Sequence, residues 1–215
     1  MKTIFFLFFV LKVDSTIVFD FQHILKDPIK EDTASGQIYR NDTLFYISVE
    51  NPLKQVLYFS SDTMIINYPS LKRAFKVKSG ITFKHQTPGG PIGRRGANLK
   101  NAGFMFLKRE VNSERKTEIW IHPENGLKII YAFEGDRLVD MVTLSDKGDT
   151  IVKITYADYQ KVKDWNIPMT LKIKSSEYEE IYKLSNPRVV PFTDSLRNYL
   201  EIAKDVKVEY KGFDK

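Results

Sequence analysis

Three histidines are the first candidates for metal or acid–base chemistry, because imidazole binds zinc and exchanges protons near neutral pH. They are His23, His85 and His122, and no two of them have the His-x-x-x-His or His-Glu-x-x-His spacing of zinc enzymes. A zinc site would need ligands that converge from distant segments. The sequence therefore predicts no metal site and no cofactor.

Nucleophilic catalysis and phosphate binding lack their usual sequence patterns as well. No Gly-x-Ser-x-Gly elbow occurs, and the chain contains no cysteine. Residues 87–96 hold four Gly, two Pro and two Arg, which predicts a loop, but the Gly-Lys-Ser/Thr of a phosphate cradle is absent. Glu179 and Glu180 could pair only if their side chains shared a face, and adjacent strand residues point to opposite faces. We predict that the protein is not an enzyme.

Basic and aromatic residues alternate in one segment, a composition that can bind single-stranded nucleic acid. The residues are Arg94, Arg95, Lys100, Phe104, Phe106, Lys108 and Arg109. No RNP-type motif accompanies them, and the basic residues are scattered along a chain with a net charge of +6. We predict no nucleic-acid partner, and interpret these residues as a solvated face or a surface near anionic lipid.

Composition indicates which elements must carry any site. The chain has 215 residues, including 15 Phe and 11 Tyr but only 2 Trp. That length suits a single domain, and the aromatic content favours strands over helices. Because there is no cysteine, disulfides and thiolate chemistry are excluded.

Short β-like runs separated by turn residues follow one another along the chain, as in an antiparallel meander. The predicted strands are 16–25, 35–40, 44–50, 55–59, 63–68, 75–78, 81–84, 104–111, 117–122, 127–133, 137–144, 150–156, 169–175 and 206–210. No helix of crossover length separates the central strands, which argues against a parallel sheet.

One amphipathic helix is predicted near the C-terminus. Leu196, Tyr199, Leu200 and Ala203 recur at helical spacing, and Thr193 or Asp194 can cap the start. The apolar stripe of this helix fits ordinary packing on the sheet or the lid of a pocket.

The N-terminus has the pattern of a secretion signal. Met1 and Lys2 precede an apolar run over residues 4–11, and cleavage after Ser15 is expected. The run is shorter than the roughly 20 residues that span a bilayer. We therefore expect a signal peptide at 1–15, export to the periplasm and a mature single domain at 16–215.

Two blocks of soft motifs resemble the periplasmic outer-membrane lipoprotein carrier family (LolA-like), and together they cover about a third of the chain. The first block contains Ser35-Gly36-Gln37-Ile38-Tyr39-Arg40, Leu44-Phe45-Tyr46-Ile47, Asn51-Pro52, Gln55-Val56-Leu57, Ser61-Asp62-Thr63-Met64 and Tyr68-Pro69. The second contains Ile154-Thr155-Tyr156-Ala157-Asp158-Tyr159, Trp165-Asn166-Ile167-Pro168 and Leu171-Lys172-Ile173. The blocks occur in the family's order with suitable spacing.

The resemblance implies a curved, incomplete antiparallel β-barrel, a half-barrel whose concave face takes up acyl chains. It also implies that Arg40 helps to hold a helical lid closed and that Phe45 takes part in lipoprotein transfer. The family begins with an amphipathic helix, whereas a strand-like run starts here at Thr16. The C-terminal helix would then form a partial lid.

Alternation then gives a list of candidate cavity residues, in two sets that each lie on one face of their strands. The candidates are Phe45, Ile47, Val49, Leu57, Phe59, Met64, Ile66, Tyr68, Leu127, Ile129, Tyr131 and Phe133. The sequence does not indicate which face is concave.

The favoured function is a periplasmic carrier that binds acyl lipid or lipoproteins in transit to the outer membrane. It implies inner- and outer-membrane transport partners, transient membrane contact and a monomer. The alternative is an envelope interaction module of the same fold that does not transport, which predicts a stable complex and no extractable lipid.

Overall fold

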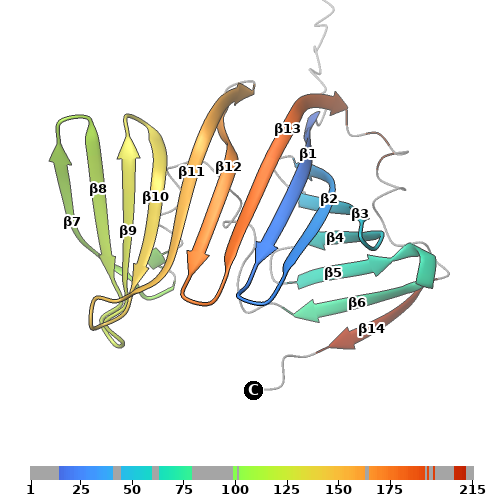
Figure 1. Ribbon diagram of the computed structural model, residues 1–215, viewed down its shortest axis with the longest axis horizontal. Helices are drawn as coiled ribbons and strands as arrows, with labels where there is room; N and C mark the ends of the chain where they lie inside the picture. The colour runs from blue at the N-terminus through green and yellow to red at the C-terminus, as the bar shows by residue number, and fades with distance from the viewer. Residues whose placement is uncertain are drawn as a thin grey trace, which may run out of the picture.

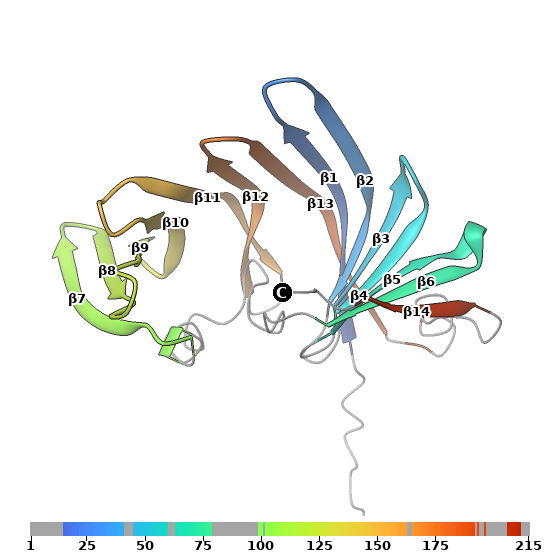
Figure 2. The ribbon, with the colours of Figure 1, turned by 90° about the horizontal axis from the view of Figure 1, so that it is seen from below.

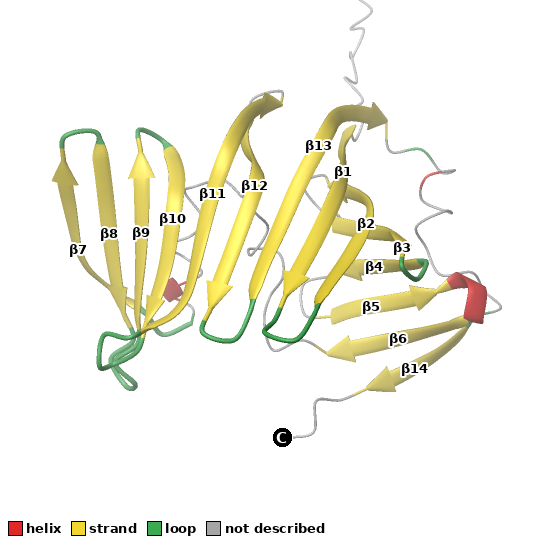
Figure 3. Cartoon of the chain, viewed as in Figure 1, coloured by secondary structure: helices red, strands yellow, loops and turns green. Residues whose placement is uncertain are grey.

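The protein is almost entirely β-strand in the parts that the computed structural model describes, which are residues 15–40, 45–59, 63–78, 99–100, 102–162, 165–191, 193, 196 and 206–211 (Figure 3). The strands are β1 Ser15–Lys26, β2 Glu31–Arg40, β3 Phe45–Asn51, β4 Gln55–Phe59, β5 Thr63–Tyr68, β6 Arg73–Lys78, β7 Met105–Asn112, β8 Arg115–Ile121, β9 Lys128–Glu134, β10 Arg137–Leu144, β11 Thr150–Val162, β12 Trp165–Ser175, β13 Glu179–Pro191 and β14 Lys207–Lys211. A short 3₁₀ turn, η1 Pro69–Leu71, joins β5 to β6.

All of these strands form a single sheet in the order β14-β6-β5-β4-β3-β2-β1-β13-β12-β11-β10-β9-β8-β7 (Figure 1). Neighbouring strands are antiparallel except for β14, which pairs in parallel with β6. Within the described residues β14 and β7 are the two edges and do not pair with each other, so the sheet is unclosed. The predicted mainly β architecture, one large, curved and unclosed antiparallel sheet, is confirmed.

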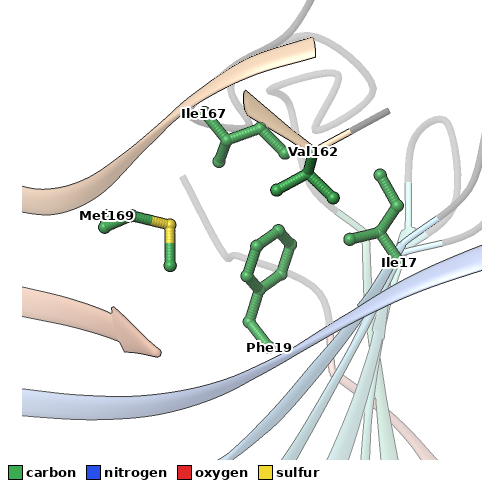
Figure 4. Packing of buried hydrophobic residues seen from close by; sticks show 5 residues of the cluster. All are labelled: Ile17, Phe19, Val162, Ile167 and Met169. Atoms are coloured by element: carbon green, nitrogen blue, oxygen red, sulfur yellow. The ribbon is translucent and has the colours of Figure 1, made fainter. Parts of the chain in front are cut away.

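The sheet bends into an arch, and the bend defines an inner face (Figure 2). Ile17 and Phe19 of β1 pack against Val162 of β11 and against Ile167 and Met169 of β12, although β13 lies between β12 and β1 (Figure 4). Side chains from strands on both sides of β13 meet only if the sheet curves toward the face that carries them. We call this face the inner face and the opposite one the outer face.

The outer face of β1–β4 carries a buried cluster of its own. Val18, Tyr39, Tyr46 and Val56 form it, and Leu196 from the segment after β13 packs against it. Ser48, on the same face, is 1% exposed. In the described part of the chain, Leu196 of the C-terminal region therefore covers part of the outer side of these strands.

The predicted C-terminal helix lies almost wholly outside the described residues. Thr193 and Leu196 are described, and the Leu196 N–H donates a hydrogen bond to the Thr193 Oγ1 at 3.3 Å, as in an N-cap. Leu196 lies on the outer face, opposite the candidate cavity residues, so this contact is sheet packing and gives no support to a lid over the inner face.

A bulge shapes the junction of β1 and β13 at the centre of the sheet. Their register shifts between Val18 and Asp20, and Asn186 takes a positive φ of 48°. Asp20 accepts hydrogen bonds from Arg188 (3.0 Å), Asn186 (2.8 Å) and Gln37 (3.0 Å) on the outer face. The hydrogen bonds from Arg188 and Asn186 lower the pKa of Asp20 to about 2. This network ties β13, β1 and β2 together where the sheet bends.

Most strand predictions match the structure, and three of them, 55–59, 63–68 and 137–144, have the observed bounds. The predicted strand 81–84 lies outside the described residues. The segment between β12 and the predicted C-terminal helix was not predicted to form a strand, which was wrong. Residues Glu179–Pro191 form β13, a 13-residue strand in the middle of the sheet.

Candidate functional site

Strand register places the candidate cavity residues of β3–β5 and β9 on the inner face. Ile38 of β2 pairs with Phe19 and with Ile47, so Ile47 shares the face of the Phe19 cluster. The same rows continue through the pairs Ile47–Leu57, Leu57–Ile66, Phe45–Phe59, Phe59–Met64 and Tyr68–Arg73. Phe45 and Phe59 occupy these rows by backbone register, while their side chains lie outside the description.

The β3–β5 group is partly exposed on this face. Ile47, Leu57, Met64, Ile66 and Tyr68 are all partly buried. Val49, at the end of β3 nearest the β1–β2 hairpin, is buried. The group forms an apolar surface whose opposite side, the outer face of the same strands, is closed by the Tyr46 cluster. An apolar surface of this kind can hold an acyl chain by burying methylene groups, at about 0.8 kcal/mol each.

The β9 group lies on the inner face too, but it is packed into the protein. Tyr131 and Phe133 are 8% and 3% exposed, and they pack with Trp120 of β8 and Leu138 of β10. Leu99, from the segment that precedes β7, is buried against the same cluster. Ile129 is partly buried at its margin. Tyr131 and Phe133 are therefore core residues in this structure.

Two further candidates lie beside these groups. Arg40 ends β2 in the inner-face row between Ile17 and Phe45, close to the proposed transfer residue. Leu127 precedes β9, where its carbonyl accepts a hydrogen bond from the His122 N–H and closes the turn after β8. The lid role of Arg40 and the ligand role of Leu127 stay predictions.

A polar group interrupts the apolar inner face at β1 and β13. The Tyr182 hydroxyl donates to Glu180 Oε2 at 2.7 Å, and His23 Nε2 lies 3.1 Å from the same oxygen. The rings of His23 and Tyr182 stack with centroids 4.2 Å apart. Burial raises the pKa of Tyr182, and the hydrogen bond to Glu180 adds to the shift, so the hydroxyl keeps its proton.

Glu179 and Glu180 point to opposite faces, as predicted. The neighbouring Glu179 pairs with Lys172 at 2.6 Å on the outer face, which holds the pKa of Glu179 below its usual value. His23 lies in the predicted strand 16–25, but no partner was predicted for it. Since β13 was not predicted, nothing in the sequence brought His23, Glu180 and Tyr182 together.

The described residues contain no group of three His, Cys, Asp or Glu side chains arranged to hold a metal ion. In that part of the chain there is also no helix with the length and hydropathy to cross a membrane. Residues 1–14, which include the predicted signal, lie outside the description.

Among the comparisons with known proteins, only those with solved structures give matches, and these agree on the fold. No family profile matches the sequence, and no curated protein matches it. Among solved structures, a domain from Vibrio parahaemolyticus described as an outer membrane lipoprotein-sorting protein domain superposes with a TM-score of 0.58 at 14% identity, over 86% of this chain and 91% of that one.

Two other structures give a similar result. A LolA superfamily protein from Nitrosomonas europaea superposes with a TM-score of 0.57 at 10% identity, covering 89% of this chain and 91% of that chain. A DUF1329 family protein from Desulfovibrio piger gives 0.58 at 11%, covering 86% and 89%. The chain therefore has a LolA-like fold, as the sequence motifs suggested, and at these identities the likeness concerns the fold.

Proposed function

We propose that the protein is an exported carrier that holds acyl lipid, or the acyl chains of lipoproteins, on the inner face of its sheet. The observation that carries the proposal is the apolar inner face of β3–β5. Ile47, Leu57 and Ile66 leave apolar surface partly exposed there, whereas Tyr46 and Val56 on the outer face are buried. A soluble sheet that curves around exposed apolar surface gains by binding an apolar ligand there.

The LolA-like fold supports the same function, because two of the solved structures are described by lipoprotein sorting or by the LolA superfamily. By analogy, the carrier would act in the periplasm and receive its cargo from an inner-membrane partner. It would deliver the cargo at the outer membrane after transient membrane contact. Arg40, in the inner-face row beside Phe45, would help to hold a cover over the ligand.

Lipid retention tests the proposal directly. Residues 16–215 are expressed, purified without detergent and incubated with a membrane extract, and bound acyl lipid or lipoprotein is measured by mass spectrometry. We expect near-stoichiometric acyl chains. A folded protein that emerges empty would overturn the carrier function.

Leu57→Asp is the matched variant, because a charge on the exposed inner surface should remove retention. Ile29→Asp is its control, since Ile29 lies in the β1–β2 turn and is 93% exposed. Both variants are compared at equal folded fraction by circular dichroism. Equal retention by the two would remove the β3–β5 surface from the binding site.

The alternative, a non-transporting interaction module, is favoured by the edge strand β7. All eight residues of β7 are exposed, with Phe106 at 45%, Leu107 at 53% and Val111 at 71%. An exposed apolar edge can pair with a strand of a second copy of the chain. A lipid-free dimer that Leu107→Lys dissociates would support this alternative, and a monomer that retains acyl lipid would reject it.

A further inference from the structure

Glu180 lies on the inner face near the start of β13, beside the β12–β13 hairpin, and β13 is the eighth of the fourteen strands. Its register partners are Ile173 in β12 and Leu25 in β1. Tyr182, the next inner-face residue of β13, has Leu171 and His23 as its partners. The neighbours of the carboxylate in its own row are therefore aliphatic, and its side chain is 22% exposed, so a ligand can reach it from outside the protein.

The three polar side chains satisfy one another only in part. Tyr182 and His23 both contact Oε2 of Glu180, at 2.7 Å and 3.1 Å. Because a carboxylate accepts hydrogen bonds, the His23 Nε2 donates to Glu180, and in the neutral form of the ring Nδ1 is an acceptor. Within the described residues neither Oε1 of Glu180 nor Nδ1 of His23 has a hydrogen-bond partner. Two acceptors are left for a donor from outside the protein.

The acceptors lie within reach of the apolar surface on β3–β5. Phe21 pairs with Gly36, and Gly36 pairs with Val49, so the row of Val49 passes one inner-face position from His23. Two strand spacings and one inner-face step separate the backbones of Val49 and His23 by about 12 Å. An acyl chain on the β3–β5 surface can extend its polar end over that distance.

We propose that Glu180 and His23 bind the polar head of the acyl ligand through a hydroxyl, amide or ammonium group that donates hydrogen bonds. The same carboxylate repels a ligand with a carboxylate head, so the site favours donor-headed lipids over free fatty acids. Tyr182 positions Glu180 by donating to Oε2. This inference rests on the carrier function proposed above, and it names the class of head group that the carrier accepts.

The test uses three ligands with the same acyl length and different heads: monolaurin, dodecylamine and laurate. Delipidated protein covering residues 16–215 is titrated with each at neutral pH, below micelle-forming concentrations, by displacement of a fluorescent apolar probe. We expect monolaurin and dodecylamine to bind about tenfold more tightly than laurate, because the repulsion between two partly screened carboxylates is modest.

Glu180→Gln keeps the shape of the side chain and removes its charge, and should bring the ratio to about threefold or less. Glu179→Gln is the matched control, because Glu179 is the adjacent residue but lies on the outer face with Lys172. That variant should keep the wild-type ratio. Thermal unfolding checks that both variants fold.

Equal binding of the three ligands by the wild-type protein would overturn the inference while the carrier function stands. A ratio that falls equally in Glu180→Gln and Glu179→Gln would overturn it as well, since a local contact cannot act from both faces. Failure of all three ligands to bind would overturn both the head-group site and the carrier function.

Discussion

The inner face of β3–β5 and the inner face of β9 both carry aromatic and aliphatic side chains, yet the two aromatic rings of β9 are almost fully buried. On β3–β5, Leu57 and Ile66 are partly buried, whereas on β9 Phe133 is 3% exposed. Leu99, from the segment before β7, belongs to the same buried cluster as Phe133, Trp120 and Tyr131 and adds cover to it. Alternation along a strand determines on which face a side chain lies. Packing by residues distant in the sequence determines whether that face stays accessible to a ligand.

The strongest test of the comparison removes a side chain from the covered region. Phe133→Ala should destabilise the protein by about 3–5 kcal/mol, because the ring is buried among Leu138, Tyr131 and Trp120. The free energy of unfolding is measured by urea denaturation. A loss below about 1 kcal/mol would mean that β9 is a loosely covered surface like β3–β5, and the contrast between the regions would fail.

A smaller effect on stability is expected in the partly exposed region. Ile66→Ala should cost about 1 kcal/mol, since a partly exposed side chain loses less burial than a core residue. Its main effect should be a severalfold lower retention of acyl lipid. If Ile66→Ala proves as destabilising as Phe133→Ala while retention is unchanged, Ile66 is a core residue and the binding surface lies elsewhere.

Sequence patterns predicted the strands well where turn residues separate regular alternation. The runs 55–59 and 63–68 end at Ser60 and Pro69, and both strands have the expected bounds. Tyr131 and Phe133 were assigned to the same face of β9 for the same reason. Their cover was not predictable, because Leu99 belongs to a segment with no periodic pattern.

Because β13 was not predicted, the contact between His23 and Glu180 could not be predicted either. Asn186-Pro187 has the pattern of a turn, but Asn186 adopts a positive φ of 48° and lets the strand continue past the proline. His23 and Glu180 lie 157 residues apart, and only the pairing of β1 with β13 brings them into contact. A site shared by two strands needs the sheet order, which local patterns do not contain.

The junction between the two regions gives the smallest expected effect. Hydrogen bonds from Arg188 and Asn186 lower the pKa of Asp20 from its usual 3.8 to about 2, so the folded protein favours the ionised form. The stabilisation is therefore present above pH 3.8 and is lost as the pH falls through about 2. Because both Asp20 and Arg188 are more than a third exposed, solvent screening reduces it to about 1 kcal/mol or less.

Asp20→Asn should accordingly lower the free energy of unfolding by that small amount at neutral pH, and the difference from the wild-type protein should vanish near pH 2. Urea denaturation across this range measures it, with Asp136→Asn in the exposed β9–β10 turn as the control. The Asp20 network lies at the β1–β13 junction and shares no residue with the Phe133 cluster, so the same variant should leave the hydrogen-exchange protection of that cluster unchanged. Loss of protection in β9 would show that the two regions unfold as one unit. They would then differ only in how deeply their inner-face side chains are buried.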